Sequence, residues 1–260
     1  MDFLKRRNRN RTSFPFRYAK ELGFGLLALA AIVIVVLALT QRDKAASAPP
    51  VPSVSAPQAS RGTVPNIDII GDSYVAGSDQ GGYGAANWTK IVGSRFYAEA
   101  RPVDMNVIAH AGAGYIVRGP EKVTFTEAAT TSLRSTADLV VVFGSRNDGR
   151  QDPANMKAAA TELFSEIRDR APQAKLIVVG PAWVDDKVPD FIVADSQALA
   201  GAAAAAGVPF VNPLSEGWFF GADAKYIGAD GVQPTDAGHE YLAGKMYKLI
   251  SANLAAMAAP

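Results

Sequence analysis

The sequence predicts an α/β fold in which a parallel sheet lies between helices, and three observations lead to this prediction. Short apolar runs rich in β-branched residues recur through residues 64–260, as in strands that are buried on both faces. Longer segments with helical spacing of apolar residues separate them, and such alternation favours a parallel sheet covered on both faces. The 197 residues of this region are enough for one well-buried core.

Each expected strand is bounded by turn residues. The five expected strands are Asn66–Ile70, Met105–Ala109, Asp138–Phe143, Lys175–Val179 and Val208–Val211. The five expected helices are Asn87–Tyr97, Thr126–Arg134, Pro153–Arg170, Asp190–Ala206 and Thr235–Met257. In the third helix, Pro153 suits a first helical turn, and the apolar residues from Met156 to Ile167 recur at helical spacing.

One N-terminal transmembrane helix is expected before this region. Residues 22–41 contain no charged side chain, and a helix of this length spans about 30 Å, the thickness of a bilayer's hydrocarbon core. The preceding residues 1–21 hold seven basic and two acidic side chains. The positive-inside rule therefore predicts a cytoplasmic tip at 1–21 and an extracytoplasmic location for everything after Arg42.

Residues 42–63 are expected to be a linker, because they are rich in Pro, Ala and Ser and show no apolar periodicity. Ala46-Ser47-Ala48 resembles a signal-peptidase site, but it lies well beyond the apolar run and is followed by Pro49. We therefore favour an uncleaved anchor over a cleaved signal peptide.

Composition and charge exclude several classes of protein. With 48% hydrophobic residues, 20% charged residues and no cysteine, the chain is not disordered, collagenous or stapled by disulfides. The net charge of +1 combines the basic tip with residues 64–260, which hold 16 basic and 22 acidic side chains. An acidic folded region argues against a nucleic-acid-binding protein.

Residues suited to catalysis follow the predicted strands, at the edge where such folds bind ligands. The first strand ends in Gly71-Asp72-Ser73, the second leads to Gly112-Ala113-Gly114, and the third is followed by Asn147. By itself, a Gly-Asp-Ser turn is more often only a turn. Glycines allow a backbone to approach a ligand closely, and an amide side chain can donate hydrogen bonds to it.

The last predicted helix brings a carboxylate and an imidazole close to each other. Asp236 and His239 are three residues apart at its start and can share one side. A serine hydroxyl needs a base to take its proton, imidazole suits that task, and a carboxylate fixes the imidazole tautomer. His110, the other histidine, is expected to line the cleft without a catalytic role.

Together, Gly71-Asp72-Ser73, Gly112, Asn147 and Asp236-x-x-His239 resemble the four sequence blocks of the SGNH hydrolase (GDSL esterase/lipase) superfamily, in order and over residues 64–260. The resemblance implies a three-layer α/β/α, flavodoxin-like sandwich with a five-stranded parallel sheet. It implies Ser73 as nucleophile and Asp236 and His239 as the other members of a catalytic triad. It also implies an oxyanion hole made by the Ser73 amide, Gly112 and Asn147, with no cofactor and no metal.

The chain departs from the family pattern at two positions. Ser145 occupies the usual glycine position of the third block, and Gln233 stands where many relatives carry a second histidine in Asp-Gly-Val-His-Pro. The first departure keeps Asn147, and we interpret the second as leaving the triad intact. Gly114 remains an alternative to Gly112 in the oxyanion hole.

The sequence therefore predicts a serine esterase outside the plasma membrane, anchored through residues 22–41, that hydrolyses acetyl or other short-chain O-acyl esters. Its partners would be a small-molecule or envelope ester substrate and the membrane, without nucleic acid. One alternative is an acyltransferase that acts on envelope glycan or lipid through the same triad. The other is a non-catalytic envelope-binding domain on an esterase fold, whose expected sign is an eroded triad.

Overall fold

Five parallel strands form the centre of the region that the computed structural model of the chain describes, residues 64–258. The strands are β1 (Asn66–Gly71), β2 (Asp104–Ala109), β3 (Leu139–Phe143), β4 (Lys175–Val179) and β5 (Phe210–Val211). Their order in the sheet is β2-β1-β3-β4-β5, and every neighbouring pair is parallel. This confirms the predicted α/β fold with a five-stranded parallel sheet.

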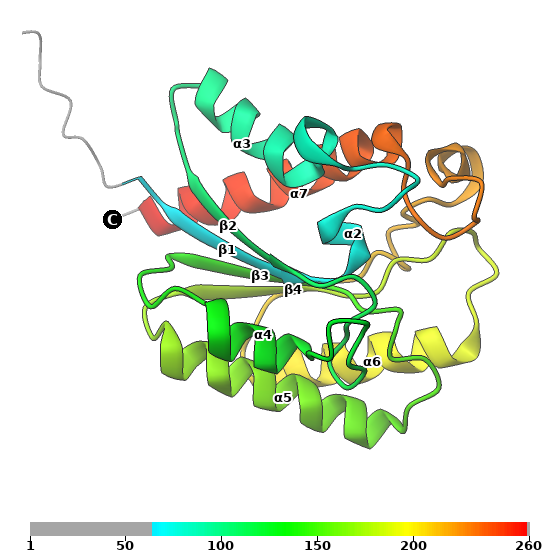
Figure 1. Ribbon diagram of the computed structural model, residues 1–260. Helices are drawn as coiled ribbons and strands as arrows, with labels where there is room; N and C mark the ends of the chain where they lie inside the picture. The colour runs from blue at the N-terminus through cyan, green and yellow to red at the C-terminus, as the bar shows by residue number, and fades with distance from the viewer. Residues whose placement is uncertain (1–63, 259–260) are drawn as a thin grey trace, which may run out of the picture. The chain divides into compact units, whose positions relative to one another are not determined.

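Helices cover both faces of the sheet (Figure 1). On one side lie α2 (Ser73–Ala76), α3 (Trp88–Ala98) and α7 (Asp236–Ala258), and on the other lie α4 (Phe125–Ser132), α5 (Pro153–Arg170) and α6 (Asp190–Ala205). Two short 3-10 helices, η1 (Gly84–Ala86) and η2 (Gly221–Tyr226), lie within the connections. The expected three layers are therefore present.

The strands supply apolar side chains to two separate cores because successive residues of a strand point to opposite faces. Ile69 and Val141 belong to the buried cluster with α3 and α7, whereas Ile70 and Val142 belong to the cluster with α4, α5 and α6. All four of these side chains are fully buried. The continuous apolar runs that predicted β1 and β3 thus reflect burial on both faces.

Two predicted elements differ from the structure by two residues at one end, and the others differ by at most one. Helix α4 stops at Ser132 instead of Arg134, because Leu133 is extended and the Arg134 amide donates to the Asp68 carboxylate, at 2.9 Å. Strand β5 has only two residues instead of the four of Val208–Val211.

The predicted cytoplasmic tip, transmembrane helix (22–41) and linker lie outside the described residues. Within residues 64–258, no helix combines the length and the apolar character needed to cross a bilayer.

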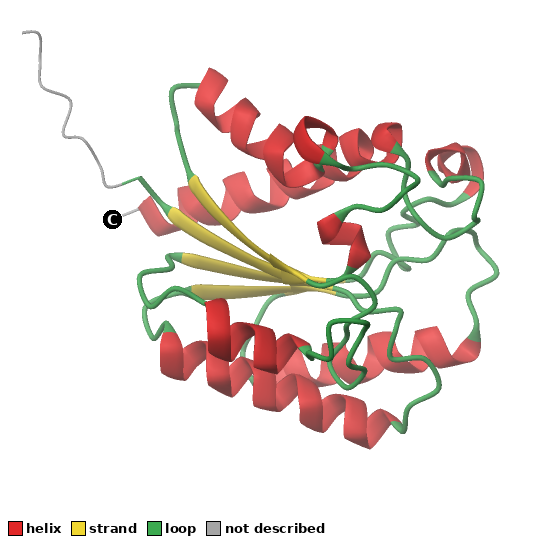
Figure 2. Cartoon of the chain, viewed as in Figure 1, coloured by secondary structure: helices red, strands yellow, loops and turns green. Residues whose placement is uncertain are grey.

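The strand order identifies the edge of the sheet at which a ligand would bind. From β1 the chain crosses to β2 on one side, and from β3 it crosses to β4 on the other. Ligands of open α/β sheets bind beyond the carboxyl ends of the strands at such a reversal. Loops gather at this edge (Figure 2), and Ser73 and Asn147 follow the two strands that flank the reversal.

Candidate active site

Ser73 is the first residue of α2, in a tight turn directly after β1. Asp72 caps this helix, since its Oδ1 accepts a hydrogen bond from the Tyr74 amide at 2.9 Å. The turn needs glycine at position 71, because a Cβ there would lie 2.3 Å from Val75 Cγ2. Ser73 is 8% exposed, and its hydroxyl makes no hydrogen bond to another residue of the described region.

Asn147 is fixed next to Ser73 by three hydrogen bonds. Its Nδ2 donates to Asp72 Oδ2 at 3.1 Å and to the Ala113 carbonyl at 2.8 Å, and its backbone amide donates to Ser145 Oγ at 2.8 Å. The buried Ser145 hydroxyl in turn donates to the Ala113 carbonyl. Ser145, in place of the usual glycine, thus helps to hold Asn147 at this edge.

The two candidate glycines after β2 have different surroundings. Gly112 has a φ of +76°, and its amide makes no hydrogen bond within residues 64–258. The Gly114 amide donates to the Val117 carbonyl at 2.9 Å, and a Cβ at Gly114 would lie 2.5 Å from the Asp148 carboxylate. Gly114 therefore makes room for Asp148, and Gly112 keeps the free amide that an oxyanion hole needs.

Two carboxyl groups are buried beneath this edge. Burial raises the pKa of Asp72 to about 7, although its hydrogen bond from Tyr74 opposes the shift. Burial also raises the pKa of Asp148, whose carboxylate accepts hydrogen bonds from the amides of Tyr115, Ile116 and Val117 at 2.8–3.0 Å. These contacts give Asp148 the structural role of holding the loop after β2.

Asp236 and His239 lie at the start of α7, as expected, but they face the segment after α2. The Gly82 amide donates to Asp236 Oδ1 at 2.8 Å, and His239 Nδ1 accepts a hydrogen bond from the Trp88 amide at 3.4 Å. His239 is fully buried, its Nε2 has no hydrogen-bond partner, and a Cβ on Gly82 would lie only 2.0 Å from that atom. Burial lowers the pKa of His239 to about 4.

The structure therefore brings Ser73 and Asn147 to one edge but does not join Ser73 to His239 or His239 to Asp236. Neither of these hydrogen bonds is present in the described part of the chain. The catalytic triad stays a prediction, and it requires Gly82 to move away from the imidazole.

A different turn lies against the neighbours of Ser73 and Asn147. The Val232 carbonyl accepts hydrogen bonds from the Tyr74 hydroxyl at 2.7 Å and from Arg146 Nη1 at 3.4 Å. Asp230 Oδ1 accepts from the amides of Val232 and Gln233, at 2.8 and 2.9 Å. The Gln233 Oε1 atom is buried without a partner.

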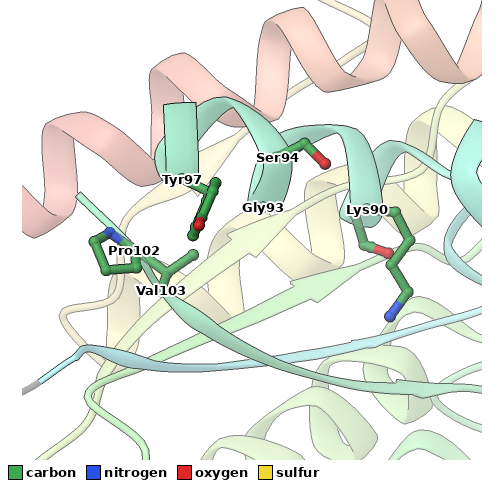
Figure 3. Close-up of a pocket in the computed structure, with 7 residues that line it drawn as sticks. Lys90, Gly93, Ser94, Tyr97, Pro102 and Val103 are labelled. Atoms are coloured by element: carbon green, nitrogen blue, oxygen red, sulfur yellow. The ribbon is translucent and has the colours of Figure 1, made fainter. Parts of the chain in front are cut away.

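The cavity between Asp72, Tyr74 and Arg146 measures about 10 Å³, about the room that one water needs. A larger hollow of about 370 Å³ lies elsewhere, against α3 and the start of β2, where Tyr97 and Pro102 line it (Figure 3). His110 makes no hydrogen bond to Ser73. Its Nδ1 lies 2.9 Å from a carboxylate oxygen of Glu121.

An α/β fold with a serine after the first strand, and an asparagine and a glycine turn beside it, defines an SGNH-type hydrolase. The chain belongs to the GDSL-like Lipase/Acylhydrolase family, whose sequence model matches residues 69–241. A GDSL lipase of Mycobacterium tuberculosis is 39% identical over 191 residues, which cover 72% of this chain and 82% of the relative. These findings make the chain an SGNH hydrolase by family.

Solved structures share the fold at low sequence identity. A lipase/acylhydrolase from Enterococcus faecalis matches with a TM-score of 0.60 at 16% identity, over 73% of this chain and 97% of the other. A family two carbohydrate esterase from Clostridium thermocellum, solved with cellohexaose, matches with a TM-score of 0.59 at 16% identity, over 74% of this chain and 65% of the other. An aryl esterase of M. smegmatis matches with a TM-score of 0.54 at 17% identity, over 73% of this chain and 99% of the other.

Sequence reasoning missed Asp72 and Gly82. Asp72 stands in the Gly-Asp-Ser motif, and its place between a buried strand and Ser73 was a signal that its carboxyl group would be buried. Gly82 lies among the glycines of residues 81–84, and nothing in that pattern indicates contact with α7, more than 150 residues later.

Proposed function

We propose that the chain is an extracytoplasmic serine esterase that hydrolyses acetyl or other short-chain O-acyl esters at Ser73. The observation that supports this most is the position of Ser73 at the reversal of the strand order, beside Asn147 and the free amide of Gly112. Ser73 Oγ attacks the ester carbonyl and loses its proton to a base. The tetrahedral oxyanion accepts hydrogen bonds from the Ser73 amide, Gly112 and Asn147.

The reaction continues through an acyl-enzyme. The C–O bond of the ester breaks, the base returns the proton to the leaving alcohol, and the acyl group stays on Ser73. The base then takes a proton from water, whose oxygen attacks the acyl carbonyl. The bond to Ser73 Oγ breaks, the base returns the proton to Oγ, and the carboxylic acid leaves. Asn147 Nδ2 must turn from the Ala113 carbonyl to reach the oxyanion, because both of its hydrogens are in use.

His239 and Asp236 act as base and orienting carboxylate only in an open form of the site. In that form the backbone at Gly81 and Gly82 has moved away from the imidazole, so that its Nε2 can reach Ser73. Its Nδ1 no longer accepts from the Trp88 amide and instead donates to the Asp236 carboxylate. The pKa of His239, which burial lowers to about 4, would rise with exposure toward the neutral range that suits a general base.

A specific observation favours a second function, an ester-binding domain with little turnover. The imidazole of His239 is buried, with the Trp88 amide bound to its Nδ1 and Gly82 packed against its Nε2. The Gly82 amide binds Asp236, so the atoms that the triad would use are already in contact with other groups. An incomplete triad is the sign expected of a non-catalytic envelope-binding domain on this fold.

The substrate class and location rest on the sequence and on the named relatives. The structural relatives include a carbohydrate esterase and an aryl esterase, and their names share the ester bond but not the kind of alcohol. An anchor at residues 22–41 with the site outside the membrane would present it to envelope glycans or lipids.

The direct test uses the full chain with a fluorophosphonate probe and p-nitrophenyl acetate. Labelling and hydrolysis should be lost in Ser73→Ala and retained in Ser94→Ala, a matched change at an exposed serine of α3. Labelling that persists in Ser73→Ala would rule out Ser73 as the nucleophile. For the location, protease added outside intact cells should cleave the folded region, and protection of this region would contradict the proposal.

A further inference from the structure

Two carboxylates at this end of the molecule each stand three residues before a side chain with a ring or amide group. One pair is Asp236 and His239, and the other is Asp230 and Gln233. Both pairs therefore have a spacing that can direct two side chains to one site, and their contacts distinguish them.

His239 is built into the packing between α7 and the segment before α3, and the exposed Asp236 binds the same segment. Gly82 binds the carboxylate, the Trp88 amide binds Nδ1, and the imidazole has no exposed surface. Asn87 Nδ2 holds the Gly82 carbonyl at 2.9 Å and the Val75 carbonyl at 2.9 Å, so the contacting segment is itself fixed. In the described form, this pair stabilises the fold.

The Asp230 and Gln233 pair belongs to the turn that is fixed against the reacting edge. Its Val232 carbonyl is bound by the residue after Ser73 and by the residue before Asn147, namely Tyr74 and Arg146. Arg146 is held in turn by Trp183, with its guanidinium carbon 4.2 Å from the ring centre. The turn is thus tied to the neighbours of both the nucleophile and the oxyanion amide.

Gln233 has the one side chain in this turn that combines a buried polar oxygen with no hydrogen-bond partner within the described residues. A native structure seldom leaves such an atom unsatisfied without a functional reason. The carboxamide offers an acceptor oxygen and two N–H donors but is not basic near neutral pH. It cannot take the proton of Ser73.

We infer that the side chain at position 233 is placed to act as the general base for Ser73 in this form of the site. Because Gln233 cannot accept a proton, the chain has no base at that position. The inference rests on the proposed role of Ser73. In this form the site binds an ester and acylates slowly, and a histidine at position 233 completes it. Nε2 or Nδ1 of that histidine then takes the proton from Ser73 Oγ and returns it to the leaving alcohol.

The test compares the full chain with Gln233→His on p-nitrophenyl acetate. General base catalysis contributes about 10²–10⁴-fold to rates, so kcat/KM should rise by about 10²-fold or more. The gain should follow a titration near the ordinary histidine pKa of about 6.5 and should vanish in the double variant with Ser73→Ala. Gln233→Asn, which adds no base, and Gln80→His, which adds imidazole at a nearby glutamine, should show no gain.

A second measurement covers the case in which Gln233→His does not fold. Gln233→Ala opens space at the same position, and free imidazole should then raise its rate of hydrolysis more than that of Gln80→Ala.

The inference is overturned if neither gain appears while His239→Asn abolishes hydrolysis by the unmodified chain. That result would leave the proposed esterase intact, with His239 as its base. If no form of the chain is labelled by fluorophosphonate at Ser73, the proposed function itself fails, and the inference fails with it.

Discussion

Gly82 lies directly against the imidazole of His239, so close that a Cβ on Gly82 would be 2.0 Å from Nε2. The same glycine donates its amide hydrogen to Asp236. One residue between α2 and α3 therefore contacts both polar side chains at the start of α7. Its φ of +81° adds a conformational requirement for glycine.

Gly82→Ala should destabilise the folded region strongly. The new methyl group would collide with a fully buried ring, and the positive φ disfavours a side chain, so we expect a loss of about 2–4 kcal/mol in the free energy of unfolding. Urea titration followed by circular dichroism measures it.

Gly84→Ala is the matched control in the same segment. Gly84 also has a positive φ, +58°, but no atom lies within 4 Å of its added Cβ. Only the conformational cost, about 1–2 kcal/mol, should appear. Equal losses in the two variants would show that Gly82 does not contact His239 in solution.

His239 should make stability depend on pH below neutrality. Its pKa is lowered by burial from 6.5 to about 4. Between pH 6.5 and 4, therefore, the imidazole is protonated in the unfolded chain but neutral in the folded chain. Stability is therefore unaffected above about pH 6.5 and falls as the pH drops toward 4, by about 3 kcal/mol from this group.

Thermal unfolding at several pH values tests this expectation. In His239→Asn, stability at pH 4 relative to that at pH 6.5 should be higher than in the unmodified chain, whereas His110→Asn, at the chain's other histidine, should leave this difference unchanged. An unchanged pH dependence in His239→Asn would mean that the imidazole is not buried as a neutral group.

Asp72 should act in the opposite direction over a similar range. Its pKa is raised from 3.8 to about 7, chiefly by burial, so the folded chain holds a proton that the unfolded chain releases. This group lowers stability as the pH rises from about 4 to 7. It thus offsets part of the effect of His239 in the unmodified chain.

Asp72→Asn should separate the two effects. Asparagine caps a helix about as well as aspartate and carries no charge, but its Nδ2 cannot accept the hydrogen bond that Asp72 Oδ2 accepts from Asn147, which costs a similar amount at both pH values. The stability of the variant relative to the unmodified chain should therefore rise by roughly 2–4 kcal/mol from pH 4 to pH 8. A relative stability that does not rise would show that the ionised Asp72 carboxylate is stabilised by its neighbours. Denaturant titrations at the two pH values decide this.

The sheet was predictable because β1 and β3 consist of runs that are apolar on both faces, and turn residues mark their ends. The positions of Ser73 and Asn147 follow, since the carboxyl ends of parallel strands share an edge. The surroundings of His239 were not predictable. Helical spacing shows that Asp236 and His239 share a side of α7, but not that this side packs on Gly82.

The end of α4 was unpredictable for a related reason. Nothing in the local pattern shows that Arg134 leaves the helix to bind Asp68, 66 residues earlier, since that carboxylate looks like one polar interruption in an apolar strand. Long-range polar contacts of this kind override local helix propensity.

Arg134 should be among the most important charged residues for stability. Its Nε donates to Asp68 Oδ1 at 2.7 Å, and its other nitrogens reach Asp104 and the Ile67 carbonyl, so it joins β1 to β2. Asp68 is fully buried, and removing the guanidinium would leave its charge poorly compensated. Arg134→Ala should therefore lower the free energy of unfolding, measured by urea titration, by about 3–5 kcal/mol.

Arg118→Ala is the control. It breaks an exposed pair with Glu127 and should lower the free energy of unfolding by at most about 1 kcal/mol. Replacing Asp68 by Asn in the Arg134→Ala background should recover part of the loss, because the uncompensated charge is then gone. Similar costs for the two arginines, or no recovery, would mean that the Asp68 charge is not what Arg134 balances.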